Sequence, residues 1–237
     1  MNILSGYPYY GQEIGILAFS GTAPRIPGDV GHAQTFSYPV RYQIVEGSFA
    51  DLIDGSPAIR RKLIDACESL KQQGVRGIVG DCGLWSLYQN EVGGRLHIPF
   101  IGSSLCQIPF IWQVIGCSGS IGIITGHSDY LKEIHLKNSG WQDSIQLSIQ
   151  GMQSMPHFTE IVIKGGVHLD ISLMHRDVLQ AAEILRSSTP DLRAVILECS
   201  NLATYSHDVS EYLKIPVFDT VSAANILYYS LNPPVFV

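Results

Sequence analysis

The amino-acid sequence predicts an α/β protein of two pseudo-symmetric lobes, each a parallel sheet flanked by helices, with an active site in the cleft between them. Three observations predict this fold class. Short apolar runs bounded by glycine or polar turn residues alternate with amphipathic helical patterns. Three segments of the first half recur, in the same order, in the second half. Hydrophobic residues make up 46% of the chain and charged residues 15%, which is typical of a well-buried globular protein.

The internal repeat is defined by matched segments and by their spacing. The segments are residues 14–17 (IGIL) and 121–124 (IGII), 75–82 (VRGIVGDC) and 192–199 (LRAVILEC), and 97–100 (HIPF) and 214–217 (KIPV). The same 117 positions separate Cys82 from Cys199 and Ile98 from Ile215. Because order and spacing agree, we interpret the halves as two copies of one unit.

Each copy contains apolar runs that read as strands buried on both faces. The predicted strands are Ile14 to Phe19, Val75 to Gly80, Ile121 to Thr125 and Ala194 to Leu197, together with a short apolar run from Ile161 to Ile163. Strands that alternate with helices favour parallel sheets covered on both faces.

One helix is predicted over Pro57 to Gln73, with charged residues opposite an apolar stripe. Ser56 can cap its first turn, and Gly74 can end it. The stripe consists of Ile59, Leu63, Ala66, Cys67 and Leu70. The matching helix of the second copy is predicted over Ile171 to Arg186.

The glycine-rich stretch from Gly116 to Ser120 separates the two copies. We therefore place the first lobe at residues 1–116 and the second lobe at residues 117–216. Residues 217–237 correspond to the segment that follows the first Ile-Pro pair, and we expect them to complete the first lobe.

Composition and charge exclude several classes of protein. The formal net charge is −6 and no basic run occurs, so we expect no nucleic acid partner. No apolar run reaches the roughly 20 residues that span a bilayer, and the first residues carry no secretory signal pattern. None of the five cysteines forms a CxxC pair, so we expect no metal site, free thiols and a cytoplasmic location. The apolar composition favours a homodimer.

Cys82 and Cys199 follow matched strands, where ligands bind in parallel sheets. Each precedes a helix-like segment, Leu84 to Glu91 or Leu202 to Leu213, so each sulfur should lie at a helix N-terminus. Free N–H groups there lower a thiol pKa and can hold a carboxylate. Two facing lobes would place the sulfurs on opposite faces of one carbon, an arrangement that suits stereoinversion by an acid and a base.

Further residues around these strand ends are candidates for holding a substrate carboxylate or amine. Arg25 can pair with a carboxylate, and His168 can act as an acid or donor, although an ordinary surface arginine and an ordinary loop histidine are the alternative readings that the sequence favours. The complete candidate set is Ser20, Thr22, Arg25, Gly83, Leu84, Thr125, His168, Ser200 and Asn201. The acidic pair Asp81 and Glu198 could orient the backbone or pair with Arg76 and Arg193.

The segments Asp81-Cys82-Gly83 and Glu198-Cys199-Ser200-Asn201, with the loop from Thr22 to Gly31, resemble the aspartate/glutamate racemase superfamily across essentially the whole chain. The resemblance implies two α/β lobes, no cofactor and one cysteine from each lobe. Glutamate racemases carry Asn-Thr after the first cysteine and Thr-His after the second, whereas this chain has Gly83-Leu84 and Ser200-Asn201. The side-chain contacts to glutamate are therefore not all present.

The function expected from the sequence is a cofactor-independent racemase or epimerase, an isomerase acting on a small carboxylate such as an amino acid or its derivative. Cys82 and Cys199 would transfer the proton, with no pyridoxal phosphate. A maleate-type cis–trans isomerase and a hydantoin racemase are the alternative enzymes. The alternative without chemistry is a carboxylate-binding module.

Overall fold

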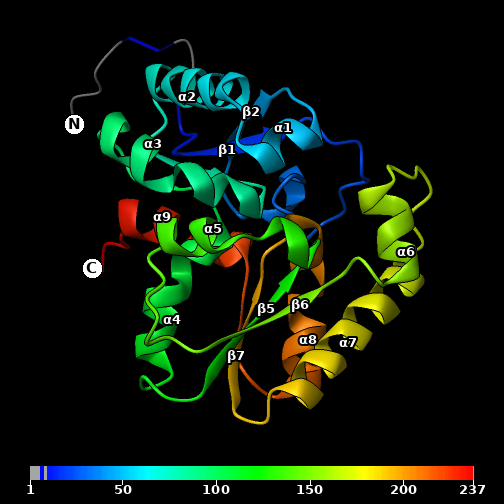
Figure 1. Ribbon diagram of the computed structural model, residues 1–237. Helices are drawn as coiled ribbons and strands as arrows, with labels where there is room; N and C mark the ends of the chain where they lie inside the picture. Colours follow the sequence, from blue (N-terminus) through cyan, green and yellow to red (C-terminus); the bar gives the residue numbers. More distant parts are fainter. Residues whose placement is uncertain (1–5, 8–9, 237) are drawn as a thin grey trace.

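The computed structural model describes residues 6–7 and 10–236, and within them it forms two lobes that face each other (Figure 1). Each lobe contains a four-stranded parallel sheet, with the orders β2-β1-β3-β4 and β6-β5-β7-β8. The first sheet consists of β1 (Ile14–Phe19), β2 (Val40–Val45), β3 (Gly77–Gly80) and β4 (Phe100–Ile101). The second consists of β5 (Ser120–Thr125), β6 (Leu147–Gly151), β7 (Leu192–Leu197) and β8 (Val217–Phe218). The predicted fold class is confirmed.

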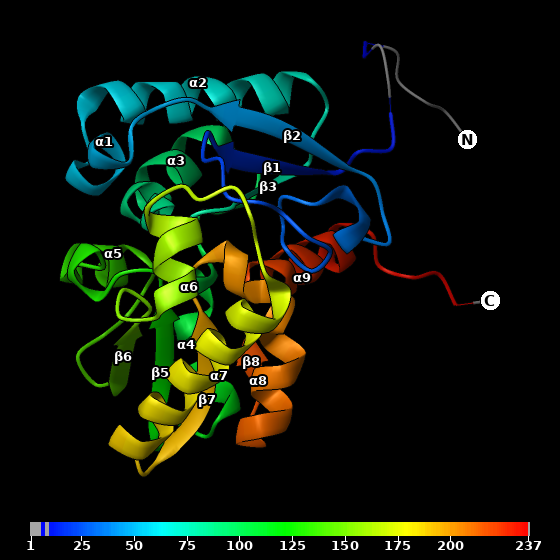
Figure 2. The ribbon, with the colours of Figure 1, turned by 90° about the vertical axis from the view of Figure 1, so that its right-hand side faces the viewer.

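The helices of the described residues flank these sheets. In the first half of the chain they are α1 (Phe49–Asp54), α2 (Pro57–Gln72), α3 (Gln89–Leu96) and α4 (Ile108–Val114). In the second half they are α5 (Glu133–Asn138), α6 (Pro156–Phe158), α7 (Ile171–Ser188), α8 (Ser206–Leu213) and α9 (Thr220–Leu231). Figure 2 shows α2 lying along the outer face of the first sheet.

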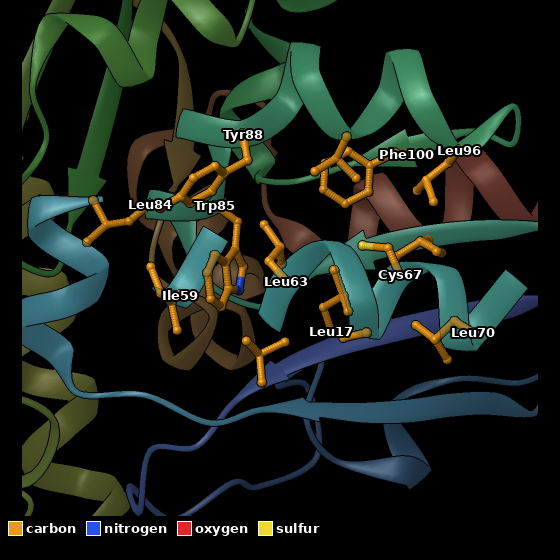
Figure 3. Close-up of a cluster of buried hydrophobic side chains, with 14 of the residues drawn as sticks. Leu17, Ile59, Leu63, Cys67, Leu70, Leu84, Trp85, Tyr88, Leu96 and Phe100 are labelled. Atoms are coloured by element: carbon orange, nitrogen blue, oxygen red, sulfur yellow. The ribbon is translucent and has the colours of Figure 1, made fainter. Parts of the chain in front are cut away.

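Helix α2 forms where its end signals predict it. The Ser56 hydroxyl accepts the N–H of Ile59 at 3.4 Å, and Gly74 adopts a φ of 87° just beyond the last turn. The whole predicted apolar stripe of this helix is buried in the core of the first lobe. Figure 3 shows this core with Trp85 inside it, beside Ile59 and Leu63. The side chain of Trp85 is fully buried, so this residue is part of the core.

The two lobes exchange helices across their junction. Ile108 of α4 packs in the same cluster as Ile123 of the second sheet, although α4 follows the first sheet in sequence. Leu227 of α9 packs with Ile14 of the first sheet, although α9 follows the second sheet. Figure 2 shows α9 beneath β1 and β3 of the first lobe. Strand β8 pairs with β7 in the second sheet, so only the part of the C-terminal segment that forms α9 packs on the first lobe.

The apolar run Ile161 to Ile163 is helical, and its predicted strand is wrong. Pro156 begins α6, and the chain continues into a π-helical turn over Thr159–Ile163. Ile161 is buried whereas Ile163 is 40% exposed, so the run turns one face inward as a helix does. A three-residue run is too short for its periodicity to distinguish a strand from a helical turn.

Across the described residues, no helix combines the length and apolar character needed to cross a bilayer. The expected homodimer stays a prediction.

Candidate active site

A cavity of about 320 Å³ lies between the lobes and receives residues from both. It is bounded by the loops that follow β1, β3, β5 and β7, because parallel strands deliver their carboxyl ends to one edge of each sheet. Of the candidates from the sequence, the cavity wall includes Thr22, Arg25, Cys82, Gly83, Leu84, Thr125, Cys199, Ser200 and Asn201.

Cys82 and Cys199 occupy equivalent positions on this wall. Each is the N-cap residue of a 3₁₀ helix, Gly83–Tyr88 for Cys82 and Ser200–Tyr205 for Cys199. Neither cysteine side chain accepts a capping hydrogen bond, although the N–H groups of Leu84 and Asn201 act to lower the pKa values of Cys82 and Cys199, respectively. The thiol of Cys199 donates to Asn201 Oδ1 at 3.7 Å. The repeat therefore brings two similarly held thiols to one cavity.

The pKa values of both thiols differ from the sequence-based expectation. Burial raises the pKa of Cys82, and the carboxyl groups of Glu198 and Asp81 raise it further. Burial also raises the pKa of Cys199, with Glu198 as the next cause. The predicted lowering of the thiol pKa by helix N-termini is wrong, because the thiolate loses its hydration and meets carboxylates. The N–H groups of the first turns offset only part of this cost.

The two thiols are distinguished by a neighbouring cation. Burial, Glu198 and Asp29 raise the pKa of Cys199, whereas the N–H of Asn201 and the guanidinium of Arg25 lower it. At Cys82 the charged neighbours Glu198, Asp81 and Cys199 all act in the opposite direction. Cys199 is therefore the thiol with the better support for negative charge.

Arg25 connects the two lobes through charged hydrogen bonds. Its Nη1 donates to Asp29 Oδ1 and to Ser200 Oγ, each at 2.9 Å, and its Nη2 donates to Asp81 Oδ2 at 2.8 Å. The side chains of Asp29 and Asp81 are 2% and 1% exposed, so this guanidinium compensates two buried carboxylates. Arg76 pairs with Glu13, so it is not the partner of Asp81.

Glu198 reaches across the cavity toward Cys82. Its Oε2 accepts the hydroxyl of Thr125 at 2.7 Å and the N–H of Gly126 at 3.3 Å. An added Cβ at Gly83 would lie 1.6 Å from Glu198 Oε1, so this carboxyl occupies the space that a side chain at Gly83 would need. Burial raises the pKa of Glu198, and no cation is among the causes that act on it. The hydroxyl of Thr125, a predicted substrate contact, is thus engaged by Glu198.

An aromatic surface on the cavity wall was not anticipated from the sequence. The ring centroids of Phe19 and Phe49 are 6.1 Å apart, and those of Phe49 and Tyr130 are also 6.1 Å apart. His127 stacks on Tyr130 with centroids 4.0 Å apart. Phe19 ends a predicted strand, which was a usable signal, but nothing local marks Phe49 or Tyr130 as neighbours. Lys164 also lines the cavity and carried no sequence signal.

Two predicted site residues do not line the cavity. Ser20 is exposed, and its hydroxyl exchanges hydrogen bonds with the backbone of Gly47, as turn residues do. His168 is exposed in the loop beyond the π-helical turn. Within residues 6–7 and 10–236, no group of three His, Cys, Asp or Glu side chains is arranged to hold a metal ion.

Two facing lobes, each with a four-stranded parallel sheet, are the class of fold that this chain shares with solved aspartate and glutamate racemases and their homologues. Arylmalonate decarboxylase superposes with a TM-score of 0.63 and 13% identity, covering 94% of both chains. Allantoin racemase from Klebsiella pneumoniae gives a TM-score of 0.60 and 17% identity, covering 93% of this chain and 87% of that one. The predicted resemblance is confirmed as a likeness of fold. No protein-family profile matches the chain.

Curated relatives in sequence are named for a different reaction. A dimethylsulfoniopropionate lyase from Durusdinium sp. clade D is 29% identical over 222 residues, which cover 90% of this chain and 73% of that protein. Dimethylsulfoniopropionate lyase 6 from Emiliania huxleyi (strain CCMP1516) is 29% identical over 232 residues, covering 93% of this chain and 61% of that protein. The chain thus spans less than two thirds of the Emiliania huxleyi enzyme.

These relatives correct the function expected from the sequence. They are lyases by name, so the prediction of a racemase or epimerase, and with it the isomerase class, is overturned. The physical reason is that one fold serves proteins of different reaction classes, as the decarboxylase and racemase neighbours illustrate.

Proposed function

We propose that this chain is a lyase that cleaves dimethylsulfoniopropionate into dimethyl sulfide and acrylate. The observation that carries the proposal is a cavity lined by two partly buried cysteines in a chain that is 29% identical, over 90% of its length, to a protein named for this activity. Because the chain covers only 61% of the longer Emiliania huxleyi enzyme, the identity of the substrate is itself a proposal.

The chemistry needs one base beside the carbon next to the carboxylate. A thiolate removes a proton from that carbon, and the released electron pair forms the double bond of acrylate. The bond from the neighbouring carbon to sulfur breaks, and its electron pair leaves with the sulfonium sulfur as neutral dimethyl sulfide. The thiol then returns its proton to solvent, so charge and atoms balance with no further reactant.

Cys199 is the base in this proposal. The N–H of Asn201 and the Arg25 guanidinium both lower the pKa of this thiol, against the effects of burial, Glu198 and Asp29. Cys82 stands at the equivalent place of the other lobe, with only acidic neighbours. A thiol there, in its protonated form, is suited to donate a hydrogen bond to the charge that develops on the substrate.

The substrate carboxylate requires donors at the opposite end of the cavity from the leaving group. Ser200 accepts a hydrogen bond from Arg25, so its own hydroxyl proton is available to donate. Lys164 lines the cavity as well and supplies a positive charge. These two residues are our candidates for holding the carboxylate.

The test is release of dimethyl sulfide from dimethylsulfoniopropionate by the purified protein under reducing conditions, measured in the headspace by gas chromatography. Cys199→Ser should lower the rate by about 10²- to 10⁴-fold, the usual contribution of a positioned base. Cys117→Ser is the matched control because Cys117 is exposed and outside the cavity wall. Absence of dimethyl sulfide with the unaltered protein would contradict the proposal.

We also propose a cytoplasmic location. The mechanism needs Cys199 as a free thiol, and the described cysteines form no disulfide. A reducing compartment maintains that state.

A further inference from the structure

The aromatic wall of the cavity is built from both lobes. We define it as Phe19 at the end of β1, Phe49 at the start of α1, and Tyr130 in the 3₁₀ turn Ser128–Tyr130. All three residues line the cavity that contains the cysteines. Phe49 is 50% exposed, which is high for a phenylalanine with aromatic partners on both sides.

The rings of the aromatic wall meet at steep angles. The planes of Phe19 and Phe49 are inclined by 64°, and those of Phe49 and Tyr130 by 63°. Rings inclined in this way form a corner and do not cover one another's faces as stacked rings would. A group in such a corner can contact the electron-rich face of at least one ring.

Core packing accounts for only part of this arrangement. Phe19 also packs edge-on against the buried Trp85, with centroids 6.0 Å apart, so it has a structural role in the first lobe. The contact between Phe49 and Tyr130 joins the two lobes at the edge of the cavity. Tyr130 also packs against the core of the first lobe and stacks on His127, which covers one face of its ring. Phe49 belongs to no core cluster of the described residues, so it is the residue whose position a ligand would best explain, with Tyr130 beside it.

The charges in the cavity do not provide a simple anionic site for a cation. The carboxylate of Asp81 is already paired with Arg25. The carboxyl of Glu198 already accepts hydrogen bonds from the hydroxyl of Thr125 and the N–H of Gly126. A compact ammonium group needs strong hydrogen-bond acceptors to replace its hydration, whereas a permethylated cation has weakly hydrated methyl groups that aromatic faces attract.

We propose that the aromatic wall is a subsite for permethylated cations, so that the cavity selects short carboxylates bearing a sulfonium or quaternary ammonium group. This inference deepens the proposed lyase function and rests on it for the placement of substrate. It assigns specificity to Phe49 and Tyr130 and leaves proton transfer to the cysteines.

Three unreactive or poorly reactive carboxylate probes separate the effect of the positive charge on binding from the effect of the shape of the group that carries it. The permethylated cation is 3-(trimethylammonio)propanoate, its neutral isostere is 4,4-dimethylpentanoate, and the compact cation is β-alanine. Titration calorimetry measures the dissociation constant of each probe with the whole protein. We expect the trimethylammonio probe to bind more tightly than either of the others.

Substitutions in the aromatic wall should change selectivity. In Phe49→Leu and Tyr130→Leu, the affinity for the trimethylammonio probe should fall roughly 3- to 30-fold, the range of a cation–π contact, with a smaller change for the neutral isostere. Phe49→Tyr keeps an aromatic face and should keep the selectivity, which separates recognition from misfolding. Phe110→Leu is the matched control, because Phe110 is 54% exposed on α4 and lies outside the cavity wall.

The outcomes distinguish the subsite from the lyase reaction. Equal losses for the trimethylammonio probe and its neutral isostere would overturn the subsite and reduce the wall to an apolar surface. Binding of β-alanine as tight as that of the trimethylammonio probe would also overturn it. Intact selectivity with no release of dimethyl sulfide would support the subsite and contradict the lyase. Release of dimethyl sulfide without selectivity for the trimethylammonio probe would support the lyase and contradict the subsite.

Discussion

Replacement of Gly83 by alanine tests a close approach of the two lobes. An alanine Cβ at this position would lie 1.6 Å from Oε1, 2.1 Å from Cδ and 2.4 Å from Cγ of Glu198. No van der Waals contact is that short, so the Glu198 side chain or the first lobe must move. Glu198 is 4% exposed, and a move of its side chain into the neighbouring cavity would break its hydrogen bonds with Thr125 and Gly126.

The cost of this substitution follows from overpacking and from lost hydrogen bonds. Forcing extra atoms into a packed interior costs about 1–3 kcal/mol. If Glu198 moves, the hydroxyl of Thr125 and the N–H of Gly126 lose their acceptor, and an unsatisfied buried donor costs about 1–3 kcal/mol. We expect Gly83→Ala to destabilise the protein by about 2–4 kcal/mol in total, because relaxation relieves part of both costs. For a chain of this size the melting temperature then falls by roughly 4–16 °C.

Circular dichroism during heating measures this effect. The matched control is Gly94→Ala, since Gly94 lies in α3 with nothing within 4 Å of an added Cβ. That variant should be unchanged or more stable by about 0.5–1 kcal/mol, as alanine favours a helix. Combining Gly83→Ala with Glu198→Ala should recover about 0.5–3 kcal/mol relative to the sum of the single changes. A Gly83→Ala protein that melts with the unaltered chain would refute the reasoning.

Three further predictions concern charge and thiol exposure. Burial raises the pKa of the catalytic thiol, so the fraction of thiolate and with it the lyase rate should increase with pH above neutral. Glu198→Gln removes a carboxyl that raises the pKa of both Cys82 and Cys199, so it should move this increase to lower pH. An unmoved pH–rate profile would count against this role of Glu198. Arg25→Met leaves two buried carboxylates unpaired and should cost about 3–5 kcal/mol in urea denaturation, whereas Arg60→Met, at an exposed pair, should cost no more than about 1 kcal/mol. Under native conditions iodoacetamide should label the exposed Cys117 first and Cys67 last, which mass spectrometry can follow. The reason is that Cys67 is 0% exposed and that burial raises its pKa to about 12. Early labelling of Cys67 would be inconsistent with the described core.

Several parts of the fold were predictable because their causes are local. Helix α2 follows from Ser56, Pro57 and Gly74, which act on the turns next to them. The buried strands β1, β3, β5 and β7 are apolar on both faces and stand out from their neighbours. The edge strands β2 and β6 could not be recognised in this way, because their residues are mostly half-buried and mix polar with apolar side chains.

The position of the site was predictable from the sequence, whereas the pKa shifts of its cysteines and the partners of its charged groups were not. The repeat placed Cys82 and Cys199 after equivalent strands, and both line the cavity. The direction of their pKa shifts depends on burial and on Glu198, whose carboxyl acts on Cys82 from the other lobe. Arg25 was expected to meet a substrate, and it meets Asp81 and Ser200, which lie 56 and 175 positions away in sequence. No local pattern carries contacts over such separations.

From the sequence alone came the two-lobed parallel architecture and the pair of cysteines, because hydrophobic periodicity, helix capping and an internal repeat act over short stretches of chain. Tertiary structure decided which groups share the cavity, how α4 and α9 cross between lobes, and that an aromatic wall forms from Phe19, Phe49 and Tyr130. Charge interactions and desolvation depend on distance in space, and that distance exists only after the lobes have packed together.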